Sequence, residues 1–182
     1  MSKYGILDAN VHARLIQSID EVCATAGIPP MYVYKSLKDY TEGKEVYWIS
    51  NYNTLRHQYS GLALVGVKKS ELRIMALCGA FIRMFINARV ISLGNVIPLK
   101  DGSPMEDVIE PSVLLIPNLQ VKTHGGKTLT AWQVQALYDV MLSRMTTGKQ
   151  TIVFIESLES LGNEYGQLFK EHIENNYLIV RE

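Results

Sequence analysis

Five short runs in the second part of the chain are apolar at nearly every position, not at every second one. Such runs are typical of strands buried on both faces of a sheet. Longer segments with helical periodicity separate them, which indicates parallel strands joined by right-handed helical crossovers. The runs are LALV (62–65), ARVISL (88–93), SVLLI (112–116), TIVFI (151–155) and YLIV (177–180). The pattern therefore predicts an α/β domain of three layers around a five-stranded parallel sheet.

The segments between these runs indicate which faces their helices bury. Residues 69–87 are apolar almost all round, which predicts a central helix packed between the sheet and other elements. Before the fourth run, Thr130 and Gln133 have the spacing of an N-terminal capping box, and a last helix is expected over 160–174. The helix after Thr130 is expected to bury an apolar stripe on the sheet. The stripe consists of Val134, Leu137, Tyr138, Met141 and Met145.

The N-terminal third has a different pattern. Apolar residues at three- and four-residue steps over 11–26 predict one amphipathic helix that stops at Gly27. An irregular aromatic segment follows, and then a second helix is expected over about 44–56. We therefore expect a helical N-terminal extension and wrapping segment over 1–60 and an α/β core over 61–182, in one compact domain overall.

Composition excludes several classes of protein. Lys and Arg number 18 and Asp and Glu 18, with 47% apolar residues, which argues against a disordered chain or a protein that coats a polyanion. Arginines interrupt the most apolar long stretch, 72–91, and no signal sequence is readable, so no membrane span is expected and the predicted location is cytoplasmic. Cys23 and Cys78 are expected as buried free thiols. No cysteine or histidine spacing predicts a metal site.

The turn after the first predicted strand, GVKKS, resembles the end of a phosphate-binding loop. In GxxxxGK[ST] the lysine and the hydroxyl residue follow the first glycine by six and seven positions. Here Lys69 and Ser70 follow Gly66 by three and four, so the loop is too short to surround a phosphate. Lys68 and Lys69 at a helix N-terminus are a weak anion site at most. A plain tight turn with two solvated lysines is the favoured interpretation.

A second candidate loop, THGGKT at 123–128, contains GKT but has Val121 where the leading glycine belongs. Its composition favours a surface loop.

Acidic residues are missing where a nucleotide-hydrolysing enzyme needs them. The third predicted strand ends in Pro117 and Asn118, whereas hydrolysing P-loop enzymes place a Mg²⁺-binding carboxylate there. Glu156, after the fourth strand, is either a polar strand end, which is favoured, or a displaced metal ligand. Between Arg144 and Arg181 there is no arginine to act on a neighbouring subunit. Neither ATP nor Mg²⁺ is therefore expected as a cofactor, and no catalytic residue is assigned.

The order of these segments resembles the AAA+ module of the DnaC/DnaI-type replicative helicase loaders. The resemblance rests on GIPPMYVYKSLKDY, LALVG, VLLIPNL and LTAWQVQALYDVMLSRMTTGKQTIVFIESL, over about residues 27–180. It implies the sheet order 5-1-4-3-2, a role near DNA replication, and, because the chain is short after Tyr177, no C-terminal lid domain. By resemblance, degenerate positions are the phosphate loop (Gly66, Lys68, Lys69, Ser70), the metal acids (Pro117, Asn118) and the sensor (Glu156, Ser157).

These features predict a pseudo-ATPase that acts by protein–protein interaction. The expected partner is a replicative helicase, a loader ATPase or a second copy of the chain. No binding to a membrane is expected. One alternative is an ATPase whose site a partner completes, using Lys69, Ser70 and Glu156. Another is a single-stranded DNA binder. Its candidate contacts are Lys68, Lys69 and Arg73, with Tyr47, Trp48 and Tyr52 as stacking residues, although packing is the favoured role of these aromatics. A further residue, Arg83, lies inside the apolar helix surface, where it needs a carboxylate or carbonyl partner or else faces another subunit; an internal ion pair is the favoured interpretation.

Overall fold

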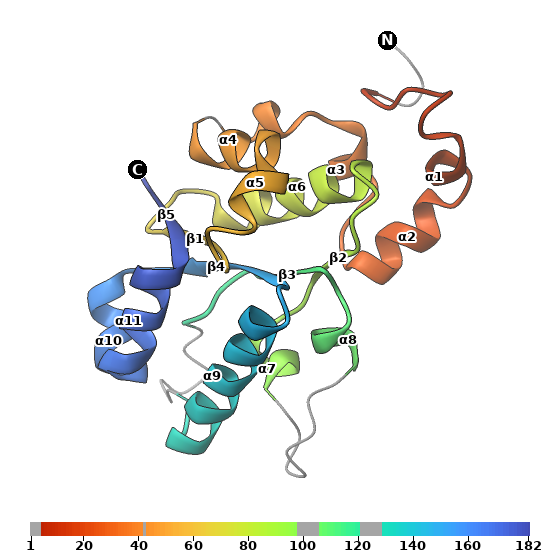
Figure 1. Ribbon diagram of the computed structural model, residues 1–182. Helices are drawn as coiled ribbons and strands as arrows, with labels where there is room; N and C mark the ends of the chain where they lie inside the picture. Colours follow the sequence, from red (N-terminus) through yellow and green to blue (C-terminus); the bar gives the residue numbers. More distant parts are fainter. Residues whose placement is uncertain (1–4, 42, 98–105, 121–128) are drawn as a thin grey trace.

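The computed structural model describes residues 5–41, 43–97, 106–120 and 129–182. Those residues form an all-parallel five-stranded sheet in the order β2-β3-β4-β1-β5 (Figure 1). The predicted fold class and the predicted order 5-1-4-3-2, counted from the other edge, are confirmed. The strands are β1 (Gly61–Val65), β2 (Ala88–Val90), β3 (Val113–Ile116), β4 (Gln150–Ile155) and β5 (Tyr177–Arg181).

Helices cover both faces of the sheet (Figure 1). Side chains alternate between two cores: Leu62 and Leu64 of β1 face one, whereas Ala63 and Val65 face the other. The first core is covered by α1 (Ala13–Gln17), α2 (Ile19–Ala26), α3 (Met31–Tyr34), η1 (Leu37–Asp39), α4 (Lys44–Ser50), α5 (Tyr52–Leu55) and α6 (Ser70–Arg83). The second core is covered by α7 (Leu93–Val96), α8 (Glu106–Ile109), α9 (Ala131–Thr146), α10 (Leu158–Tyr165) and α11 (Gln167–Asn176).

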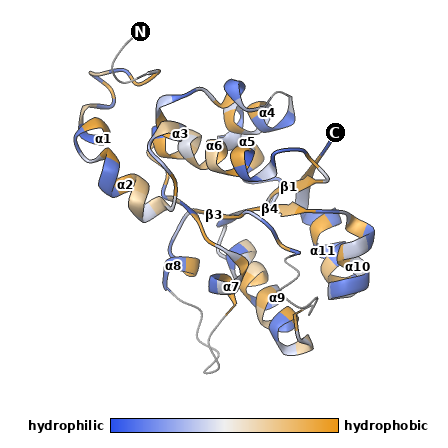
Figure 2. Cartoon of the chain, turned by 180° about the vertical axis from the view of Figure 1, so that it is seen from behind, coloured by the Kyte–Doolittle hydropathy of each residue, from blue (hydrophilic) through white to orange (hydrophobic). Residues whose placement is uncertain are grey.

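The central helix α6 is buried almost all round, as its composition predicts. Figure 2 shows it between α3 and α5, on the same side of the sheet as α4. Gly79 allows α3 to approach closely, because a Cβ at this position would lie 2.2 Å from the backbone oxygen of Tyr32. On the other face, the capping box of α9 is present: Thr130 Oγ1 accepts from Gln133 N at 3.4 Å, and Gln133 Oε1 accepts from Thr130 N at 2.9 Å.

Several predicted elements are shorter than expected. The helix predicted over 11–26 breaks at Ser18, whose hydroxyl donates to Arg14 O (3.1 Å), and the one predicted over 44–56 breaks at Asn51, whose amide donates to Tyr47 O (2.9 Å). Such side chains compete with the helix for its own carbonyls. The last helix breaks at Gly166, which has a φ of +92°. Strand β2 stops at Val90, since α7 begins directly after Ser92.

The expected ion pair of Arg83 is wrong. Its guanidinium donates to three backbone oxygens at the end of α3, those of Tyr32 (3.1 Å), Val33 (3.1 Å) and Lys35 (3.0 Å). The carbonyls at a helix C-terminus have no partner within the helix, so a cation beside them is stabilised without a carboxylate.

Cys23 and Cys78 are buried free thiols, as predicted. Within the described residues, every helix is too short or too polar to cross a bilayer.

Candidate functional site

The carboxyl ends of the parallel strands form the edge of the sheet where ligands bind in folds of this kind. At this edge lie the turn from β1 into α6, the residues that follow β3 and β4, and Glu182 after β5. The second candidate loop, 123–128, and Val121 lie outside the described residues.

The turn from β1 into α6 consists of Gly66 to Lys69. Gly66 has a φ of +65°, and its N–H donates to Ile155 O at 2.9 Å. The side chain of Val67 is buried in the first core, whereas those of Lys68 and Lys69 are exposed. Lys69 is the N-cap of α6 in a left-handed conformation (φ +53°), which is unusual for a residue other than glycine. The turn therefore joins β1 to α6 directly, without a longer loop, as the short spacing from Gly66 to Ser70 predicts.

A carboxylate of the chain itself lies on this turn. Lys68 N donates to Glu182 Oε2 at 3.4 Å. Arg73, in the first turn of α6, forms an ion pair with Glu182 through Nη1 and donates from Nε to Glu45 Oε1 at 2.7 Å. These contacts tie together α4, α6 and the residue after β5. Glu182 and Glu45 were not among the predicted site residues, because contacts across more than a hundred positions or between separate helices leave no local spacing signal.

The residues after β3 serve as structural links. Asn118 Oδ1 accepts a hydrogen bond from Gln120 N at 2.9 Å, which stabilises the turn after β3. The preceding residue, Pro117, is half-buried. Gln120 is 2% exposed, and its side chain joins two neighbouring elements. Its Oε1 accepts from Glu156 N at 2.9 Å, and its Nε2 donates to Ser160 Oγ at 2.9 Å. Sequence reasoning missed Gln120, since a lone glutamine after a strand carries no distinctive pattern.

The residues after β4 divide between a structural role and exposure to solvent. Ser157 caps α10, since its Oγ accepts from Ser160 N at 3.0 Å. The side chain of Glu156 is exposed, and the backbone oxygen of Glu156 would lie 3.3 Å from a Cβ at Gly66. The structure therefore brings Gly66, Asn118 and Glu156 to one edge, with Gln120 between the last two.

No protein-family model and no curated protein sequence matches the chain. Solved structures do match it. The DnaC helicase loader superposes with a TM-score of 0.60 at 17% identity, over 83% of this chain and 99% of that one. The chain therefore has the same fold as the DnaC helicase loader. DnaI superposes with a TM-score of 0.62 at 12% identity, over 84% of this chain and 93% of that one.

A third match is the AMPPCP-bound DnaA of Aquifex aeolicus, with a TM-score of 0.57 at 13% identity, over 80% of this chain and 50% of that one. The predicted resemblance to AAA+ helicase loaders is thus confirmed for the fold. At these identities the likeness carries no information on activity.

The residues predicted to contact nucleic acid do not form one exposed surface. Lys68 and Lys69 are exposed on the turn, but Arg73 is 6% exposed and held by two carboxylates. Trp48 and Tyr52 are 0% and 3% exposed, so stacking on bases is wrong for both and the packing role favoured from the sequence is confirmed. The reason is that α4 and α5 lie against α6, where Tyr52 packs edge-on against Phe81 with ring centroids 5.0 Å apart. Of the three aromatics, Tyr47 is exposed.

Arg144, the late arginine of the segment that carries the resemblance, is buried on α9 at 1% exposure. It donates to the backbone oxygens of Val108 (2.7 Å), Pro111 (3.1 Å) and Gln150 (2.7 Å) and to Thr151 Oγ1 (3.1 Å). Burial lowers the pKa of Arg144 to about 10. The side chain joins the segment before β3 to β4 by hydrogen bonds. Because its guanidinium is buried within the chain, it is not exposed to another subunit.

Proposed function

We propose that this chain is a non-catalytic, AAA+-like protein that acts by protein–protein interaction in DNA replication, as an accessory or regulatory subunit of the helicase-loader type. The observation that supports this best is the turn from Gly66 to Lys69, which is short and carries Glu182 on the N–H of Lys68.

This turn is poorly suited to binding a nucleoside triphosphate. A phosphate loop needs a series of free backbone N–H groups around the β-phosphate. Here the N–H of Gly66 is bonded to Ile155 and that of Lys68 to a carboxylate. A phosphate beside Lys68 would approach the negative charge of Glu182, and like charges repel strongly near partly buried groups.

The metal-binding half of the site is also unsuited to catalysis. Phosphoryl transfer in hydrolysing P-loop enzymes depends on Mg²⁺ held by a carboxylate at the end of the third strand of the sheet. At this position β3 is followed by Pro117 and Asn118, and the oxygen of Asn118 accepts a backbone hydrogen bond. Without this charge the metal would be bound weakly, which supports the absence of hydrolysis.

The proposed partners follow from the fold. The solved structures of similar fold include the DnaC helicase loader and DnaI. A chain that keeps this fold while lacking nucleotide chemistry would retain the surfaces through which such modules contact other proteins. We therefore propose a replicative helicase, a loader ATPase or a second copy of this chain as the partner.

The geometry also supports one alternative, an ATPase whose site is completed by a partner. Lys69 and Glu156 are both exposed at the same edge of the sheet, and Ser70, the first residue of α6, is half-buried. An ATPase site completed by another subunit would use these three side chains.

The experiment combines the purified chain with the replicative helicase of the same organism and with ATP. We expect the two proteins to elute as one complex in size-exclusion chromatography, and ATP hydrolysis to equal that of the helicase alone. Lys69→Ala should leave both results unchanged, as should Lys38→Ala, a matched exposed lysine away from the turn. Additional hydrolysis that Lys69→Ala alone abolishes would establish the partner-completed ATPase. Separate elution of the two proteins would exclude the helicase as a partner.

A further inference from the structure

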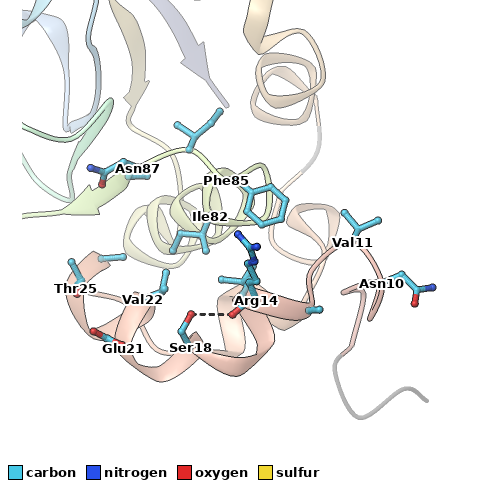
Figure 3. Close-up of a pocket in the computed structure, with 15 residues that line it drawn as sticks. Asn10, Val11, Arg14, Ser18, Glu21, Val22, Thr25, Ile82, Phe85 and Asn87 are labelled. Carbon is cyan, nitrogen blue, oxygen red and sulfur yellow. Dashed lines mark hydrogen bonds between the residues drawn. The ribbon is translucent and has the colours of Figure 1, made fainter.

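A groove of about 880 Å³ lies between the N-terminal helices and the far end of α6, away from the turn at Gly66 (Figure 3). One wall comes from α1 and α2, and the other from the end of α6 and the chain that enters β2. Its floor is apolar, which means that the groove offers hydrophobic surface to a ligand. The floor is formed by Leu15, Val22, Ala26, Ile82, Ile86 and Ala88.

Phe85 stands at the mouth of this groove in a strained conformation. After α6 the chain makes the paired hydrogen bonds that commonly end helices, from Phe85 N to Ile82 O (2.9 Å) and from Ile86 N to Phe81 O (3.0 Å). This arrangement requires a left-handed residue, which is usually glycine, and here Phe85 adopts a φ of +57°. A bulky side chain at such a position is costly, and strained residues cluster at sites of function.

The ring of Phe85 is exposed despite this cost. It is 61% exposed and stacks on His12, with ring centroids 5.5 Å apart. A ring that served packing alone would be buried. Val11, which also lines the groove, is 63% exposed. The groove therefore has an apolar rim as well as an apolar floor.

Arg14 supplies a positive charge over this floor. In Figure 3 its guanidinium rises from α1 toward Ile82 and Phe85. Within the described part of the chain, Arg14 takes part in no ion pair. The carboxylate of Glu21 also lines the groove, but it lies on the side of α2 away from Phe85 (Figure 3). A ligand that complements the groove therefore has an apolar face flanked by a negative charge.

We propose that this groove binds an amphipathic α-helix of a protein partner, with the apolar face on the floor and against Phe85 and a carboxylate paired with Arg14. The wall from Ala13 to Ala26 consists of two helices separated by the break at Ser18, α1 of 5 residues and α2 of 8 residues. At 1.5 Å per residue α2 alone is about 12 Å long, which matches about two turns of a docked helix. Helices that dock in this way place apolar residues at i, i+3, i+4 and i+7. The inference goes beyond the proposed function, because it names one docking surface and does not depend on whether a nucleotide binds.

The test selects binders from a displayed library of helical peptides of about 18 residues, with apolar and charged positions randomised on a neutral helical frame. We expect selected peptides to carry apolar residues at the spacing above with Asp or Glu beside them. Phe85→Gly should weaken binding at least about tenfold, as should Arg14→Glu. Replacing the peptide carboxylate by lysine should restore binding to the Arg14→Glu protein.

Two controls separate docking from folding. Phe85→Gly relieves the left-handed strain, so its melting temperature should equal or exceed that of the unaltered chain. Leu168→Ala removes a side chain that is 65% exposed on α11, outside the groove, and should leave peptide binding unchanged.

Several results would overturn the inference. One is that no selected peptide requires both Phe85 and Arg14 of the protein for binding. Another is Phe85-dependent binding of vesicles of equal parts phosphatidylcholine and phosphatidylglycerol without peptide binding, which would assign the groove to a lipid surface. Phe85-dependent self-association in sedimentation would assign it to a second copy. ATP binding in the same samples would contradict the proposed function and leave the groove unaffected.

Discussion

The guanidinium of Arg73 donates from Nε to Glu45 Oε1 at 2.7 Å, deep between α4 and α6, with both side chains shielded from solvent. The same guanidinium pairs with Glu182, which in turn accepts from the N–H of Lys68. The start of α6, the position of the phosphate-binding turn in P-loop folds, is thus connected by charged side chains to two other parts of this chain, α4 and the residue after β5. This network has consequences for both stability and ligand binding.

Removal of Glu45 should strongly destabilise the fold. The Glu45→Ala variant leaves the buried Arg73 with only the partly exposed Glu182, and breaking a buried ion pair costs about 3–5 kcal/mol. Urea unfolding, followed by far-UV circular dichroism, measures this loss. The double replacement of Glu45 by leucine and Arg73 by methionine should recover most of it, because apolar side chains of similar volume pack without an uncompensated charge. A loss below about 1 kcal/mol in the single variant would show that the pair contributes little.

Acid should destabilise the chain through His172. This ring is buried between Tyr138 and Tyr177, and burial lowers its pKa. Because the folded pKa lies below the ordinary value of about 6.5, the unfolded chain takes up the proton first as pH falls. The contribution of the neutral ring is therefore complete above about pH 6.5 and is lost below it.

The measurement is the free energy of unfolding between about pH 8 and pH 5 for the unaltered chain and for His172→Gln. The difference between the two curves should narrow as pH falls through this range. His57→Gln, at an exposed position, is the matched control for the replacement of a histidine by glutamine. A constant difference between the unaltered chain and His172→Gln would mean that the ring has the same pKa in both states.

Gly79 should be intolerant of alanine even though it lies within a helix. Alanine is favoured over glycine in a helix by about 1 kcal/mol, but a Cβ at this position would lie 2.2 Å from Tyr32 O. The clash is with backbone, so α3 must move away from α6, and we expect a net loss of at least about 2 kcal/mol. Gly94 in α7 is the matched control, since no described atom lies within 4 Å of a Cβ there. Gly94→Ala should be neutral or stabilising in thermal unfolding, and equal losses in both variants would contradict the packing of α3.

The sequence was informative where the signal is local. Runs that are apolar at every position identify the strands, and the number of residues between Val65 and Ser70 is enough to predict that the phosphate loop is short. It was uninformative where a side chain bonds across the fold. Glu182 on Lys68, Gln120 between β3 and β4, and the carbonyl partners of Arg83 all depend on tertiary positions that no spacing reveals.

The helix breaks were missed for a related reason. Ser18 and Asn51 are tolerated in helices, and only the hydrogen bonds of their side chains to carbonyls four residues earlier mark them as ends. The apolar periodicity continues through both breaks, so the pattern predicts one helix where two are present.

Thermal unfolding in the presence of ATP and Mg²⁺ at millimolar concentration addresses the nucleotide pocket most directly. A ligand at a hundredfold excess over its dissociation constant stabilises a fold by about 2.7 kcal/mol, or roughly 5–10 °C for a chain of this size. We expect the melting temperature of the chain to remain unchanged, and that of Lys69→Ala to respond to ATP in the same way. A rise of several degrees that Lys69→Ala abolishes and Lys38→Ala retains would contradict the proposal that the pocket is closed.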